Sequence, residues 1–172
     1  MMQIQLAQCS DLLRIKEMYI QVTAAMMRSG LAVWDEVYPA EFVAEDIAQK
    51  RLYVLTEDTH LLAGFVLCRT HAHAVAVTWQ HDDKRACYMD RLAVSVPCAR
   101  KGIGTIALRY ALSLAKMQGA QVLRLFVADT NLPAIAFYKK NGFSQCLGSY
   151  EEKIDDTLTL RFYGFEISVL ES

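Results

Sequence analysis

The feature that most constrains the fold is a seven-residue loop at residues 95–101, which joins two long apolar segments. The segment before it, RACYMDRLAVSV at 85–96, is dense in apolar residues and predicts a buried central strand. The segment after it, at 102–118, carries apolar residues at helical spacing and is followed by Gly119, a residue type that commonly ends helices. A central strand followed by a helix predicts a layered α/β protein.

The remaining apolar patterns predict a single domain over residues 1–172, and a chain of this length can bury one sizeable core. The order of elements, without a linker or an internal repeat, predicts one mixed sheet with helices on both faces. Strands are expected at 3–8, 51–57, 60–70, 85–96, 121–128, 143–152 and 158–170, and helices at 10–30, 40–50, 102–118 and 131–142.

The bulk composition narrows the classes of function. A net charge of −1 gives no overall basic field, so neither nucleic acid nor a membrane is expected as a partner. The five cysteines and four histidines lack the spacing of metal ligands, and free thiols are typical of a reducing cytosol. Because the chain shows no signal-peptide pattern and no apolar run of roughly 20 residues, we expect a soluble cytoplasmic protein without a metal.

The loop and the start of the following helix, VSVPCARKGIGTIALRY at 94–110, predict a binding site for a phosphate group. A Walker A loop is excluded because Gly104 is followed by Thr105 without the required lysine. A Rossmann loop is disfavoured because seven residues separate the strand from the first glycine. The backbone N–H groups of residues 100–104 are instead expected to converge at the helix N-terminus, where unpaired donors and the helix dipole favour an anion.

This loop resembles motif A of the GNAT superfamily of acyl-CoA N-acyltransferases, Q/R-x-x-G-x-G/A, although Ala99 stands at the Q/R position. NLPAIAFYKKNGF at 131–143 resembles the downstream motif N-x-x-A-x-x-F-Y-x-x-x-G-F, and both motifs lie within a core at 86–145. The resemblance implies a mostly antiparallel sheet with a splayed central strand pair and acetyl-CoA as the acyl donor. It implies donor contacts from Leu92, Ala93, Val94, Arg100, Lys101, Gly102, Ile103, Gly104, Thr105, Asn131 and Tyr138.

Acyl transfer to an amine requires a group that protonates the departing thiolate, and the resemblance assigns this role to Tyr138. The pKa of a phenol is near 10, which suits proton transfer to a thiolate. Packing of the Tyr138 ring beside Phe137 is the alternative interpretation. Asn131 is a candidate N-cap of the following helix; the resemblance places it near the donor, and one side chain could serve both purposes.

A base must also accept the proton of the attacking amine. Asp90 is the first candidate, because a carboxylate in so apolar a strand needs a reason. It could equally form a structural ion pair with Arg91 or Arg51. Tyr88, two residues before Asp90 on the same strand, is a second candidate near the substrate.

The segment AVWDEVYP at 32–39 lies where the family places its acceptor-binding loop, between the first two helices. Trp34 and Tyr38 are expected to form a wall for an amine, with Asp35 or Glu36 attracting its ammonium. The alternative is that these aromatic rings fill the edge of the core.

Together these features predict an N-acyltransferase that moves an acetyl group from acetyl-CoA to a primary amine of a small molecule, protein or peptide. The alternative is a non-catalytic acyl-CoA-binding regulatory module, which Ala99 favours and Tyr138 disfavours. Residues 71–84, including Trp79, are expected to border the acceptor cleft. The terminal strands offer edges for a homodimer.

Overall fold

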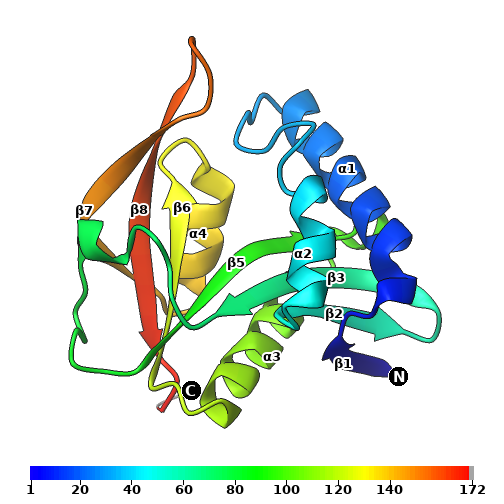
Figure 1. Cartoon of the computed structure of the whole chain (residues 1–172), viewed down its shortest axis with the longest axis horizontal. Coiled ribbons are helices and arrows are strands. Elements are labelled where there is room, and N and C mark those ends of the chain that lie inside the picture. Colours follow the sequence, from blue (N-terminus) through cyan, green and yellow to red (C-terminus); the bar gives the residue numbers. More distant parts are fainter. Residues whose placement is uncertain (171–172) are drawn as a thin grey trace. The chain divides into compact units, whose positions relative to one another are not determined.

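The computed structural model describes residues 1–170, which form two compact units (Figure 1). The first unit comprises Met1–Leu67 with Met89–Ala111, and the second comprises Cys68–Tyr88 with the described residues from Leu112 onward. Strand β5 (Ala86–Val94) and helix α3 (Ile103–Met117) contribute residues to both units. Neither unit is therefore one continuous segment, and the single domain expected from the sequence stays a prediction.

The first unit is built on an antiparallel sheet. Strand β2 (Leu52–Glu57) pairs with β1 (Met2–Leu6) on one side and with β3 (His60–Cys68) on the other. β2 and β3 form a hairpin, as the two-residue turn at 58–59 between the expected strands predicts. After β5 ends, the N–H of Ser95 donates to the carbonyl of Leu62 over 2.8 Å, which ties the start of the loop to β3.

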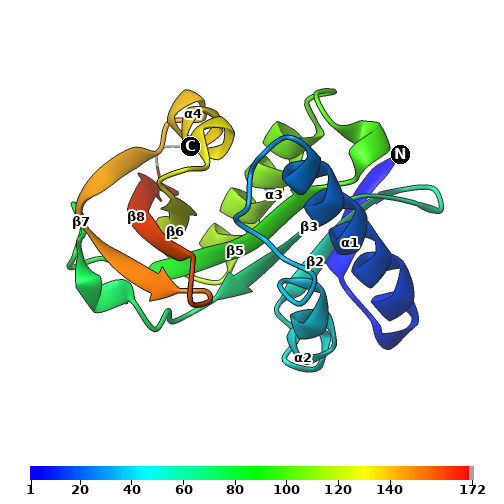
Figure 2. The same ribbon diagram turned by 90° about the horizontal axis from the view of Figure 1, so that it is seen from above.

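Helices cover both faces of this sheet. Helix α1 (Leu12–Arg28) and helix α2 (Val43–Ala48) lie on one face, and the first turns of α3 lie on the other (Figure 2). The apolar stripe of α1 includes Ile15, Met18 and Tyr19, spaced three and four residues apart and almost fully buried. This burial explains why α1 packs on the sheet.

The second unit contains the other half of the strand order β1-β2-β3-β5-β6-β8-β7-β4. Strand β8 (Thr159–Ser168) pairs antiparallel with β6 (Val122–Ala128) and β7 (Ser144–Lys153). β6 runs parallel to β5 and pairs with it through the first three residues of each strand, the pattern expected of a splayed pair. Helix α4 (Leu132–Lys140) follows β6.

The predicted order of strands and helices is confirmed, and the α/β class with a mixed, mostly antiparallel sheet is confirmed with it. The short strand β4 (Val77–Thr78), which pairs with β7, was not predicted. Two residues are too few to show an alternation. Short 3-10 turns also precede α1 (Cys9–Asp11), α2 (Ala40–Phe42), β4 (Ala74–Ala76) and α3 (Val96–Cys98).

Strand β5 has an unusual backbone at Arg91, where φ is +54°. A side chain with a Cβ rarely adopts this left-handed conformation, and inside a strand it interrupts the regular alternation. Asp90, Arg91 and Leu92 are accordingly all half-buried, instead of alternating between buried and exposed. The bend separates the start of β5 from the residues that lead into the predicted phosphate loop.

Candidate functional site

The predicted phosphate loop has the backbone geometry of an anion-binding turn. After the 3-10 turn at Val96–Cys98, φ is positive at Arg100 (+61°) and at Gly102 (+79°). Left-handed residues that alternate with right-handed ones direct successive N–H groups toward a common point. A Cβ added at Gly102 would meet no heavy atom within 4 Å, so the space in front of this glycine is open.

The start of α3 supplies further unpaired donors. Its first backbone hydrogen bond runs from the N–H of Ile106 to the carbonyl of Gly102 over 3.1 Å. The N–H groups of Ile103, Gly104 and Thr105 precede this bond and have no carbonyl within the helix. The side chain of Ile103 is buried and anchors this first turn. The helix N-terminus carries the positive end of the helix dipole, so these backbone donors favour binding of a phosphate group.

A buried ion cluster lies beside the bend of β5. Asp46 on α2 accepts hydrogen bonds from Arg91 Nε (3.1 Å) and Nη2 (2.8 Å) and from Arg51 Nε (2.6 Å). The Asp46 side chain is only 2% exposed, so its charge depends on these two arginines. Both arginines therefore bind Asp46, and the charge of Asp90 in addition raises the pKa of Arg91.

Asp46 was missed from the sequence, although it left a signal. It stands between Val43 and Ile47 on the stripe that α2 buries, where a carboxylate needs a cation. Burial lowers the pKa of Arg91, but Tyr38, Asp46 and Asp90 together raise it above its ordinary value. Arg91 therefore stays charged.

Tyrosines complete the surroundings of Arg91. The hydroxyl of Tyr19 donates to the carbonyl oxygen of Arg91 over 2.7 Å. The hydroxyl of Tyr38 accepts a 3.4 Å bond from Arg91 Nη1, and the guanidinium lies 5.7 Å from the ring centres of Tyr38 and Phe42. Burial raises the pKa of Tyr19 and of Tyr38, so both phenols stay neutral and act as hydrogen-bonding groups.

The predicted acceptor loop is ordered by these aromatic rings. The Trp34 ring packs edge-on against Tyr19 and Tyr38, with ring centres 5.8 Å and 6.3 Å apart. The rings of Trp34 and Tyr38 both remain half-buried. The Asp35 carboxylate accepts hydrogen bonds from the backbone N–H groups of Val37 (2.8 Å) and Tyr38 (2.7 Å) and so stabilises the turn. Glu36 is exposed, so the loop carries its negative charge at the surface.

In the second unit, the downstream motif forms α4 as predicted. The side chain of Asn131 caps this helix by accepting the N–H of Ala134 over 3.2 Å. Tyr138 is 9% exposed and its ring makes edge contacts with Phe137 at 5.2 Å and Phe143 at 5.5 Å. The ring packing that the alternative interpretation requires is therefore present, and a role for the hydroxyl stays a prediction.

Tyr88 and Trp79 lie in the core of the second unit. Both rings are buried, and the Tyr88 hydroxyl accepts a 3.3 Å bond from Arg124 Nη1. Arg124 also pairs with the fully buried Glu166 over 3.1 Å and lies 4.4 Å above the Trp79 ring. The expectation that Trp79 borders a cleft is wrong, because its apolar surface fills the core instead.

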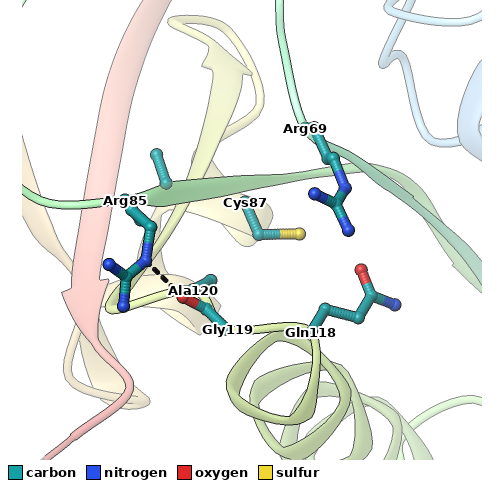
Figure 3. A pocket seen from close by; sticks show the side chains of 7 residues that line it. Arg69, Arg85, Cys87, Gln118, Gly119 and Ala120 are labelled. Carbon is teal, nitrogen blue, oxygen red and sulfur yellow. Dashed lines mark hydrogen bonds between the residues drawn. The ribbon is translucent and has the colours of Figure 1, made fainter.

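A pocket of about 240 Å³ also opens in the second unit, at the start of β5 (Figure 3). Arg85 Nε donates to the carbonyl of Gly119 over 2.9 Å, which places a cation at the C-terminal end of α3. None of the predicted site residues lines this pocket. Its lining is Arg69, Arg85, Ala86, Cys87, Gln118, Gly119 and Ala120.

No helix in the described part of the chain is long and apolar enough to cross a membrane. Within residues 1–170, no three His, Cys, Asp or Glu side chains gather as a metal site would require.

The fold is similar to that of several acetyltransferases. An acetyltransferase of the GNAT family from Streptococcus agalactiae aligns over 97% of this chain and 95% of its own, with 21% identity and a TM-score of 0.79. The ribosomal-protein-S18-alanine N-acetyltransferase of Escherichia coli aligns over 98% and 94%, with 14% identity and a TM-score of 0.68. A Salmonella typhimurium structure with its cofactor acetyl-CoA aligns over 98% and 94%, with 15% identity and a TM-score of 0.69.

At these identities the structures support the fold alone, and no curated protein sequence matches the chain. The model of the acetyltransferase (GNAT) family matches residues 19–143, which include the bent strand, the phosphate loop and the Asn131–Tyr138 motif. The loop geometry and the fold agree with this match. The chain therefore belongs to the GNAT family of acetyltransferases, and its fold supports acyl-CoA-dependent acyltransferase activity.

Proposed function

We propose that the protein transfers an acetyl group from acetyl-CoA to a primary amine of a small molecule, protein or peptide. The observation that carries the proposal is the loop at 99–105, where two left-handed residues precede the unpaired N–H groups of α3. The proposal that the transferred acyl group is acetyl is supported by the Salmonella typhimurium structure, which contains acetyl-CoA. An alanine of ribosomal protein S18 is the acceptor that the name of the Escherichia coli neighbour gives for that protein, and it is the reason to include protein and peptide amines.

The loop is proposed to bind the pyrophosphate of the donor through the N–H groups of residues 100–105. The open space at Gly102 admits a bulky anion close to the backbone. Ala99 has extended dihedral angles and offers no polar side chain, which removes one contact that the family motif implies. Arg100 and Lys101 are exposed beside it, and their charges are proposed to compensate.

The C-terminal end of β5 is proposed to hold the thioester arm. Backbone N–H groups of Leu92, Ala93 and Val94 follow the bend at Arg91 and would bind the pantetheine amides and polarise the thioester carbonyl. Such donors stabilise the oxyanion that develops when the amine attacks, because they are fixed before the reaction begins.

Proton transfers are assigned to two side chains. Asp90 is proposed to accept the proton of the amine, directly or through water, since it is half-buried next to the bend. Tyr138 is proposed to protonate the thiolate as the C–S bond breaks, with Asn131 contributing to the donor site at the start of the same helix. The amine then carries the acetyl group and the thiol leaves.

The acceptor is proposed to bind at the loop between α1 and α2. Trp34 and Tyr38 offer half-buried aromatic surface, and the exposed carboxylate of Glu36 attracts an ammonium group. Tyr88 was a further candidate for substrate contact, but its burial and its bond with Arg124 favour packing.

The test is release of free thiol from acetyl-CoA with a panel of small amines and short peptides. Release that depends on an amine supports the transferase. Binding of acetyl-CoA without release with any amine would favour the alternative that the chain is an acyl-CoA-binding regulatory module, for which Ala99 is the supporting observation.

Location and assembly are also proposals. We place the protein in the cytoplasm on its free cysteines. A homodimer would extend the sheet through β1, because β1 ends the strand order, whereas the C-terminal strand β8 is flanked by β6 and β7.

A further inference from the structure

The backbone conformation of Arg91 has a cost that its surroundings must offset. The left-handed region of backbone dihedral angles is populated roughly tenfold less by a residue with a Cβ than by glycine. Arg91 nevertheless has φ of +54° in the interior of β5, where no turn or helix end requires it. Strained backbone of this kind persists only when neighbouring groups hold it in place.

Three groups in the first unit hold Arg91 at both its backbone and its side chain. The Tyr19 hydroxyl binds the Arg91 carbonyl oxygen at 2.7 Å, which fixes the peptide that joins Arg91 to Leu92. The Asp46 carboxylate binds the guanidinium at two nitrogens, 2.8 and 3.1 Å away. The Tyr38 ring and hydroxyl contact the same guanidinium from the acceptor loop.

A left-handed residue also changes the direction of the N–H groups that follow it. In a regular strand, successive N–H groups point to alternate neighbouring strands, and a residue with positive φ rotates the next peptide out of this pattern. The next N–H groups along β5 are those of Leu92 and Ala93, which the proposed mechanism assigns to the acyl donor. The conformation of Arg91 thus determines where these donors point.

We propose that Arg91 is a positioning residue: held by Asp46 and Tyr19, it maintains the bend of β5 and thereby directs the Leu92 and Ala93 N–H groups toward the acyl donor. This inference rests on the proposed transferase function. It adds that helices α1 and α2 set the geometry of the donor-binding strand through one residue, Arg91, although neither Asp46 nor Tyr19 contacts the donor in this proposal.

Arg51 provides a matched control. Its Nε binds the same Asp46 carboxylate at 2.6 Å, but Arg51 lies next to β2 and not on β5. Arg51→Ala and Arg91→Ala each remove one of two cations from one buried carboxylate. A purely structural role for the cluster predicts similar losses of thermal stability and of activity in both variants.

The experiment measures kcat and the KM for acetyl-CoA at saturating amine, together with the melting temperature. We expect Arg91→Ala to lower kcat about 100-fold, the usual effect of a displacement near 1 Å at a reacting centre. Arg91→Gly removes the same contacts but permits the left-handed conformation, so it should retain about tenfold more activity than Arg91→Ala. Arg51→Ala should keep kcat within about twofold of wild type.

A second measurement does not depend on turnover. Hydrogen exchange at the Leu92–Val94 amides should change in Arg91→Ala and stay as in wild type in Arg51→Ala. If the Arg91 and Arg51 variants lose kcat equally, or if exchange at these amides is unaffected in Arg91→Ala, the positioning role is wrong.

The two proposals fail in different ways. If wild-type protein releases no thiol with any amine, the transferase proposal fails, and amide exchange alone then decides whether Arg91 holds the bend. If Arg91→Ala does not fold, Tyr19→Phe removes only the hydroxyl bound to the Arg91 carbonyl. It should alter exchange at Leu92 and lower kcat about tenfold, and wild-type values for both would overturn the inference.

Discussion

Replacement of Gly102 by alanine tests the phosphate loop most directly, because the structure separates its effect on folding from its effect on binding. The added Cβ would meet no heavy atom within 4 Å, so no steric clash is expected in the free protein. The remaining cost is the left-handed backbone at φ +79°, which disfavours alanine relative to glycine by about 1 kcal/mol. For a chain of this size, that cost lowers the melting temperature by about 2–4 °C.

The effect on coenzyme A binding should be larger than this small loss of stability. The Cβ would occupy the space in which we propose that the pyrophosphate approaches the backbone, so the ligand must move away from the N–H groups. We expect the Kd for coenzyme A, measured by titration calorimetry, to rise at least tenfold, which corresponds to about 1.4 kcal/mol.

Gly119→Ala is the control for this experiment. Gly119 lies just past the other end of α3, has φ of +84° and also faces open space. It should lose similar stability while keeping wild-type affinity for coenzyme A. The reasoning is refuted if Gly102→Ala binds coenzyme A as tightly as wild type, or if both glycine variants lose affinity to the same extent.

Three further outcomes follow from the side chains. Tyr138→Phe keeps the ring contacts and should lower turnover roughly 10- to 1000-fold with little change in acetyl-CoA affinity; unchanged turnover would assign the ring to packing. Glu36→Gln should mainly raise the amine KM, whereas Asp90→Asn should lower kcat and shift the acidic limb of its pH profile, and an unmoved limb would exclude Asp90 as the base. Arg124→Met leaves buried Glu166 without its arginine and should cost about 3–5 kcal/mol in urea unfolding, and a loss below 1 kcal/mol would contradict the importance of this pair.

Most of the fold was predictable because its signals are local. The apolar stripe of α1, the Asn131 cap of α4 and Gly119 after α3 each act within one or two helical turns of sequence. Strand β4 escaped prediction because its two residues pair with β7, more than 60 residues away, and carry no pattern of their own.

In the phosphate loop, a glycine marked the unusual backbone in the sequence. Gly102 is the kind of residue that permits an unusual backbone, and the structure shows a left-handed conformation there. Arg91 adopts a similar conformation without any such signal, because tertiary contacts rather than its own preference impose it. Its partner Asp46 lies 45 residues earlier in the chain, so the pair appears only after folding.

The two tryptophans of the chain make it suited to optical measurements. Trp79 is buried, its indole N–H donates to the carbonyl of Ala74 over 2.8 Å, and its surroundings are those of a fixed core. Trp34 stands half-buried in the proposed acceptor loop between two tyrosine rings. Emission from Trp79 therefore serves as a constant background. If an amine binds at this loop as proposed, the change in intrinsic fluorescence on its addition reports on Trp34, and candidate acceptors can be screened without a label or a coupled reaction.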